Sequence, residues 1–190
     1  MDSDQGFKEL TRRSGVLLRS HGFKGSGQNF KREIAEQWQG INFQKSQWRQ
    51  ERADPIAFYL NIGVHFPLVQ CERHPALKPT TFAKFTAMKA DQRLRVEDLG
   101  PDVGELLVDG ETLEAFWKRF AALLTETAVP ALDRMTTREG LAEAFRRIPW
   151  MAFGTIREVL GPLAPPPWEP SDKDRWKTDD RGLWWGPGEW

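Results

Sequence analysis

PIAFYLNIGVHF, residues 55–66, has the most regular alternation of apolar and polar side chains in the chain. The apolar positions are Phe58, Leu60, Ile62, Val64 and Phe66, and the residues between them are Tyr59, Asn61, Gly63 and His65. Because successive side chains of a β-strand point to opposite faces, this pattern predicts a strand with one apolar and one polar face. Such alternation is typical of an antiparallel sheet that is covered on one side only.

The residues before this strand predict a helix followed by extended segments. FKELTRRSGVLLRS, residues 7–20, has helical apolar spacing, and Gly22 stands where a helix C-cap favours glycine, so the helix should end near His21. NFKREIAE (29–36) and QGINFQKSQW (39–48) follow as extended segments. The glycine-rich stretch FKGSGQNFKRE (23–33) leads from a helix into a strand, the reverse of a phosphate-binding loop, so it predicts a turn with positive φ at its glycines and no nucleotide.

The second half predicts mainly helices. ETLEAFWKRFAALLTET (111–127) has the clearest apolar stripe, Pro130 can open a short continuation, and Thr136 with Glu139 has capping-box spacing before a helix that carries Leu141 and Phe145. A last helix is predicted around Ile156 and Leu160. In the middle of the chain, TTFAKFTAM (80–88) fits a strand or a short helix, RLRV (93–96) fits a strand, and GPDVGELLVDG (100–110) reads as a loop.

These patterns predict an α+β fold. We expect residues 1–163 to form one domain, in which a single antiparallel sheet of about three to five strands has helices packed on one face. Residues 164–190 form a tail rich in proline and tryptophan, with five of the nine tryptophans of the chain. Exposed indoles at that density would favour aggregation, so we expect Trp176, Trp184 and Trp185 to dock on the body of the chain or on a dimer mate.

Composition limits the compartment and the partners. No apolar run is long enough to span a membrane and residues 1–10 lack the features of a secretory signal, which together with the single Cys71 indicates a cytoplasmic protein. The net charge is zero, but residues 1–96 hold 16 Lys and Arg against 9 Asp and Glu, and residues 97–190 hold 11 against 18. Either the two halves pack together, or the basic half presents a face to nucleic acid or to an acidic protein.

A set of short motifs in the first third of the chain resembles a known family. The motifs are a long helix, then GFK at residues 22–24, NF at 29–30, NFQKS at 42–46 and NIGV at 61–64. In this arrangement the chain resembles an uncharacterised, mainly bacterial family catalogued as a domain of unknown function. The resemblance implies a small α+β domain and carries no activity with it.

Candidate metal ligands and nucleophiles form incomplete sets. His65, Cys71 and His74 lie close together in the sequence, but a structural zinc site normally takes four ligands and a catalytic dyad needs an orienting third group. We therefore expect no metal, no cofactor and no catalytic residue among them.

The polar face of the sheet is the strongest candidate for a binding site. Alternation sends six hydrogen-bonding side chains outward from two neighbouring strands, namely Asn42, Gln44, Ser46, Tyr59, Asn61 and His65. Lys31, Lys45 and Arg49 flank them and would suit an acidic target, although helices or the tail could equally cover this face.

Three functions are compatible with these patterns. The leading hypothesis is a non-enzymatic module that binds another protein, such as a bacterial immunity protein that neutralises a toxin. The alternatives are a hydrolase or nuclease that uses His65 or Cys71 with the polar face, and a nucleic-acid-binding module that uses the basic first half.

Overall fold

The predicted strand at residues 55–66 forms the centre of an antiparallel sheet in the computed structural model. The model describes residues 3–45, 56–69, 81–95, 106–108, 112–146, 154–165, 177–178 and 184–185. Five strands follow one another across the sheet in chain order, and a sixth pairs with the fourth. They are β1 (Lys24–Ser26), β2 (Asn29–Ile34), β3 (Gln37–Lys45), β4 (Ile56–His65), β5 (Gln92–Arg95) and β6 (Leu106–Val108). The prediction of an α+β fold with one antiparallel sheet is confirmed.

The glycine-rich stretch forms the turns around the first hairpin. Positive φ is observed, as predicted, at Gly22, Gly25 and Gly27. The short strand β1 contains Gly25 and pairs with β2. At Gly25 a Cβ atom would lie 2.1 Å from the Asn29 carbonyl oxygen, so a side chain has no room there. Glycine is therefore required by both the backbone angle and the close approach of the two strands.

β6 corrects one of the sequence predictions. Residues 100–110 were expected to form a loop, but Leu106–Val108 pair with residues 56–58 of β4. Three residues are too few to show an alternating pattern. The strand forms because the edge of β4 beyond β5 offers hydrogen-bonding groups that need partners.

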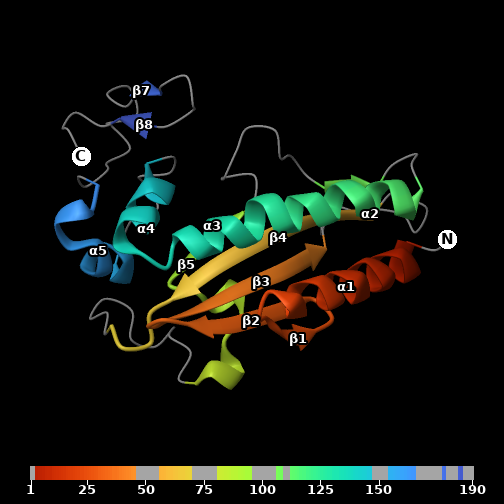
Figure 1. Cartoon of the computed structure of the whole chain (residues 1–190), viewed down its shortest axis with the longest axis horizontal. Helices are drawn as coiled ribbons and strands as arrows, with labels where there is room; N and C mark the ends of the chain where they lie inside the picture. Colours follow the sequence, from red (N-terminus) through yellow and green to blue (C-terminus); the bar gives the residue numbers. More distant parts are fainter. Residues whose placement is uncertain are drawn as a thin grey trace.

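Helices cover the apolar face of the sheet (Figure 1). Those along the sheet are α1 (Ser3–Ser20), α2 (Leu113–Ala122), the π-helical η5 (Leu123–Ala128) and α3 (Val129–Arg134). Beyond the end of α3 follow α4 (Arg138–Phe145), α5 (Thr155–Leu160) and the short η7 (Gly161–Leu163). α2, η5 and α3 run on without a break, so Pro130 continues a helix, as predicted. α2 begins at its N-cap Thr112, whose hydroxyl accepts a hydrogen bond from the Ala115 N–H.

The N-cap of α4 differs from the prediction by one residue. Thr137 is the N-cap, and its hydroxyl accepts a hydrogen bond from the Gly140 N–H at 3.1 Å. The Thr136 hydroxyl instead donates to the Asp133 carbonyl at the end of α3. The capping-box prediction of Thr136 with Glu139 is therefore wrong, because Thr136 serves the preceding helix.

The opposite face of the sheet is covered over part of its area by residues 81–91, which we call the strap. The strap contains two short 3₁₀ helices, η2 (Phe82–Lys84) and η3 (Ala87–Lys89), so of the two predictions for this stretch the helical one is closer. It lies over Gly40 and Gly63, which face each other on β3 and β4. A Cβ atom on Gly63 would lie 2.7 Å from the Ala90 Cβ and 2.9 Å from the Ala87 carbonyl oxygen. The strap can lie this close only because both strand positions are glycine.

The close contact at Gly63 leads to a testable prediction. Gly63→Val should lower the free energy of unfolding by about 1–3 kcal/mol, because the new side chain must push the strap away from the sheet. Denaturant unfolding measures the change, and hydrogen exchange at Ala87–Lys89 should rise with it. Gly22→Val tests the glycine effect without the strap, since no atom lies within 4 Å of a Cβ at that position and only its positive φ is strained. Unchanged exchange in the strap of Gly63→Val would contradict the prediction.

The tail is described in two short strands only. β7 (Lys177–Thr178) pairs with β8 (Trp184–Trp185), while the side chains of both strands and all of Trp176 lie outside the described part of the chain. The predicted docking of Trp176, Trp184 and Trp185 therefore stays a prediction.

Deleting residues 166–190 tests this docking. We expect the truncated protein to melt at a lower temperature or to be less soluble, because docked indoles would lose their burial. The truncation keeps Pro165, whose carbonyl accepts a hydrogen bond from the Arg157 guanidinium. A soluble truncate with an unchanged melting temperature would indicate that the tail does not dock.

Candidate functional site

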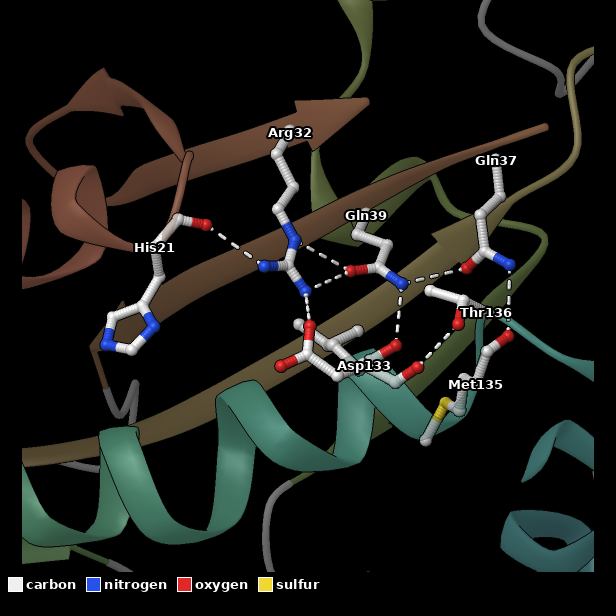
Figure 2. A network of polar contacts seen from close by, with 8 residues as sticks. His21, Arg32, Gln37, Gln39, Asp133, Met135 and Thr136 are labelled. Atoms are coloured by element: carbon white, nitrogen blue, oxygen red, sulfur yellow. Dashed lines mark hydrogen bonds and ion pairs between the residues drawn. The ribbon is translucent and has the colours of Figure 1, made fainter. Parts of the chain in front are cut away.

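A buried arginine organises the polar contacts on the helical side of the sheet (Figure 2). Arg32 of β2 donates from Nε and Nη2 to the Gln39 Oε1 at 2.9 and 2.7 Å, and from Nη1 to the His21 carbonyl at 3.0 Å. Its Nη2 also pairs with Asp133, and its guanidinium lies 4.4 Å from the centre of the Phe23 ring. These contacts connect the end of α1, two strands and the end of α3.

Two glutamines extend this network along β3. Gln39 donates to the Leu132 carbonyl at 2.6 Å and to the Gln37 side chain at 2.9 Å, and Gln37 donates to the Met135 carbonyl at 3.0 Å. The carbonyls at the end of a helix lack partners within the helix, so the two side chains satisfy part of the end of α3. Because its charged and amide groups have partners, we interpret this network as structural.

The sequence analysis missed this network. Gln37 and Gln39 occupy the same face of β3 as Ile41 and Phe43, and both are buried. The alternation of side chains along β3 was the one indication in the sequence, because it places residues 37 and 39 on the same apolar side as residues 41 and 43. Nothing in the sequence indicated that helix carbonyls would lie above them.

On the opposite side, asparagines from three neighbouring strands form a row. Asn29 of β2 is opposite Asn42 of β3, and Asn42 is opposite Asn61 of β4. Asn61 Nδ2 donates to Asn42 Oδ1 at 3.2 Å, and Asn42 Nδ2 donates to Asn29 Oδ1 at 2.9 Å. We call these three residues the amide row. Both hydrogen bonds are donated in the same direction along the row, from the buried Asn61 toward the exposed Asn29.

The direction of the hydrogen bonds determines which groups remain for a ligand. Asn61 Nδ2 also donates to Gln44 Oε1 at 3.2 Å, so the oxygens of Gln44 and Asn29 each already accept one hydrogen bond. Within the part of the chain that the structure describes, the NH₂ groups of Gln44 and Asn29 have no acceptor. Since Gln44 is half-buried and Asn29 is exposed, these NH₂ groups make the row mainly a set of donors for a partner.

Tyr59 borders the row with an arginine stacked on its ring. It lies opposite Gln44 in the strand register, and the Arg95 guanidinium lies 4.2 Å from the centre of its ring. A cation over an aromatic face restricts the motion of both groups. Arg95 comes from β5, opposite Asn61, so the site extends over four strands.

The structure brings five of the six predicted residues onto one face. Asn42, Gln44, Tyr59, Asn61 and His65 point to the same side of β3 and β4, while Ser46 and Arg49 lie outside the described residues. These side chains differ in how far they are exposed. Asn42, Asn61 and His65 are 6%, 0% and 1% exposed, so Asn42 and Asn61 can only position the groups around them.

His65 lies apart from the amide row, beneath the strap. Its ring stacks on Phe85 at 5.8 Å between ring centres and lies 5.1 Å from Trp38. Its Nδ1 is 2.8 Å from Asp91 Oδ2, an ion-pair distance when the imidazole is protonated, although the direction of the contact does not meet hydrogen-bond geometry. His65 points to the polar side, as the alternation predicts, but the strap covers that part of the face.

The two flanking lysines also differ from the expectation. Lys45 points to the helical side, where its ammonium pairs with Asp4 at 2.6 Å and lies 5.0 Å from the Phe7 ring centre. Lys31 points to the polar side but holds the strap, because its Nζ donates to the carbonyls of Phe82, Ala83 and Phe85 at 2.7, 2.6 and 3.2 Å. Burial lowers the pKa of Lys31 below its ordinary value. Neither lysine is therefore at the rim of the amide row.

Comparison with known proteins identifies the family. A family model described as a domain of unknown function, DUF4304, matches residues 15–134. The chain belongs to the DUF4304 family. In this DUF4304 protein the match runs from residue 15 within α1 through strands β1–β6 to the end of α3. It includes the amide row, the strap and the Arg32 network except for Met135. No curated protein and no solved structure matches the chain.

The described part of this DUF4304 protein offers no site for a metal ion. There, no three His, Cys, Asp or Glu side chains are grouped so that they could hold a metal ion. Cys71 and His74 lie outside the described residues, so the expectation of no metal stays a prediction. The helices described include none that could span a membrane.

Proposed function

We propose that this protein is a non-enzymatic module that binds another protein through the accessible groups of the polar face. The observation that carries the proposal is the direction of the amide row, which leaves the NH₂ groups of Asn29 and Gln44 as donors beside Tyr59. Amide and phenol groups held on paired strands lose little freedom on binding, which favours recognition.

The supporting geometry is that of a rigid scaffold. The buried Asn61 donates to two neighbours at once and so fixes the orientation of both the Asn42 and the Gln44 amides. In its more specific form the proposal is that the partner is a toxin, which the chain neutralises by covering it. The hydrolase or nuclease hypothesis has less support, because His65 is buried beneath the strap.

Site-specific crosslinking in the native host tests the proposal. A photo-reactive amino acid at position 59 should capture a discrete protein, whereas the same group at Lys118, exposed on α2, should not capture it. The double variant Asn29→Ala/Gln44→Ala should then lose at least about tenfold in affinity for the captured protein, because two donors are removed.

The matched control is Gln5→Ala/Lys118→Ala, two exposed positions on the helices. Equal binding by both double variants would contradict the proposal. For the toxin form, producing the captured protein alone in a heterologous host should stop growth, and co-production of wild type but not of Asn29→Ala/Gln44→Ala should restore it. Growth unaffected by the captured protein would contradict that form alone.

A further inference from the structure

The outer surface of the strap and the strand positions beside it carry exposed cations. Lys84 and Lys89 belong to the strap, Lys24 is opposite Lys31 on the edge strand, and Arg93 is opposite Gly63 on β5. Lys31 and Gly63 both contact the strap, which places Lys24 and Arg93 at its two sides. All four side chains are exposed. We call these four residues the cationic surface.

The cationic surface has few negative charges to balance it. Within the described part of the chain, none of Lys24, Lys84, Lys89 and Arg93 forms an ion pair. Two of the described acidic residues lie on this face: Glu33 accepts from the Trp38 indole at 3.1 Å, and Asp91 faces His65 and accepts from the Phe66 N–H. Both carboxylates are therefore already engaged with the protein.

An apolar group lies within this surface. Met88 is 40% exposed between Lys84 and Lys89, and its sulfur lies 3.5 Å from the Arg93 Nη1. A flexible thioether packs against side chains of many shapes, which suits it to contact with another protein. An exposed apolar residue that lies beside cations, here Lys89 in the chain and Arg93 in space, is complementary to an acidic segment that carries one apolar side chain.

We infer that the partner presents an acidic, acceptor-rich segment to the cationic surface, with an apolar side chain on Met88. The inference rests on the proposed function, because the amide row next to the strap also presents donors, and carboxylates and main-chain carbonyls are acceptors. Charge at the rim governs the association rate and its salt dependence, and the amide row governs which acceptors fit.

A nucleic acid is the other polyanion that could bind here, and the aromatic residues favour the protein. Unpaired bases gain much of their affinity by stacking on open aromatic faces. On this face the Tyr59 ring is stacked under Arg95, Phe82 packs against Trp38 and lies below Lys31, and Phe85 is buried. The described residues thus offer no open ring on which a base could stack.

Two probes distinguish these partners in the full-length protein. A short peptide rich in glutamate with a single leucine should shift the NMR signals of Lys84, Met88, Lys89 and Arg93, and its affinity should fall steeply as salt rises toward ~150 mM. A peptide of the same charge without leucine should leave the Met88 methyl signal in place. Absence of shifts in the strap, or tighter binding of an oligothymidine to the same residues, would overturn the inference.

Charge reversal separates this inference from the proposed function. Lys84→Glu/Lys89→Glu should lower the affinity for the acidic peptide by about tenfold or more. The control variant Lys8→Glu/Lys118→Glu, with both positions exposed on the helices, should lower this affinity by less than about twofold. Near-ultraviolet circular dichroism checks that both variants keep the fold. If Asn29→Ala/Gln44→Ala no longer binds the host partner but both charge variants bind the peptide equally well, this inference alone would be overturned. The reverse result would overturn the proposed function alone.

Discussion

Phe58→Ala should lower the free energy of unfolding by about 3–5 kcal/mol, because the side chain is buried at the centre of the core and leaves a cavity when it is truncated. Phe58 is 0% exposed, and its ring packs against four others: Phe7 at 5.8 Å, Phe43 at 6.4 Å, Phe116 at 6.0 Å and Phe120 at 5.4 Å between ring centres. These rings come from α1, β3 and α2, so the substitution loosens both helices from the sheet at once.

Phe82→Ala is the matched control for Phe58→Ala. Phe82 is the same residue type, but it is only half-buried on the strap and packs against Trp38 and Lys31. Its truncation exposes little new apolar surface and should cost roughly 1 kcal/mol. Chemical denaturation of the two variants gives the comparison, and similar losses would contradict the central position of Phe58 in the core.

Gln39→Leu should lower the free energy of unfolding by a similar amount, about 3–5 kcal/mol, for an electrostatic reason. The substitution removes the oxygen that accepts two hydrogen bonds from the buried Arg32, and it removes the donor to the Leu132 carbonyl. Leucine fills much of the same space, so the loss comes from polar groups left without partners rather than from a cavity. Urea unfolding of the variant measures the change.

The control for Gln39→Leu is Gln28→Leu, since Gln28 has an exposed side chain between β1 and β2. It should change the free energy of unfolding by less than about 0.5 kcal/mol, as surface substitutions usually do. Asp133→Asn adds a second comparison. Asp133 is 52% exposed, so solvent screening should keep the cost of losing its charge below about 1 kcal/mol. A tolerated Gln39→Leu would mean that water replaces the lost hydrogen bonds.

Local sequence patterns were sufficient to predict a helix or strand where one of its faces packs against the core. The alternation from Phe58 to Phe66 predicted β4, and the stripe from Leu113 to Leu124 predicted a helix where α2 and η5 lie, because buried positions recur with the period of each element. The π-helical form of η5 was not predicted. The positive φ of Gly22, Gly25 and Gly27 followed from their place between a helix and a strand. The α+β fold and the direction of most polar side chains were therefore predictable from the sequence.

What covers each face could not be predicted from local patterns. His65 and Asn61 alternate correctly to the polar side, yet the strap and neighbouring side chains bury them. The strand period predicts to which face a side chain points, but only long-range packing determines whether another segment covers that side chain. The strap itself has no periodicity, and it is held by the glycine pair, the Lys31 ammonium and the ring of His65.

The candidate site divides in the same way. The sequence by itself determined that Asn42, Gln44, Tyr59 and Asn61 share a face, because side chains two apart on paired strands must do so. Only the tertiary structure decided that Asn29 joins them, that their amides are oriented to present donors, and that Arg93 contacts Met88 of the strap. The reason is physical: strand register, hydrogen-bond direction and the path of the strap each depend on residues far apart in the chain.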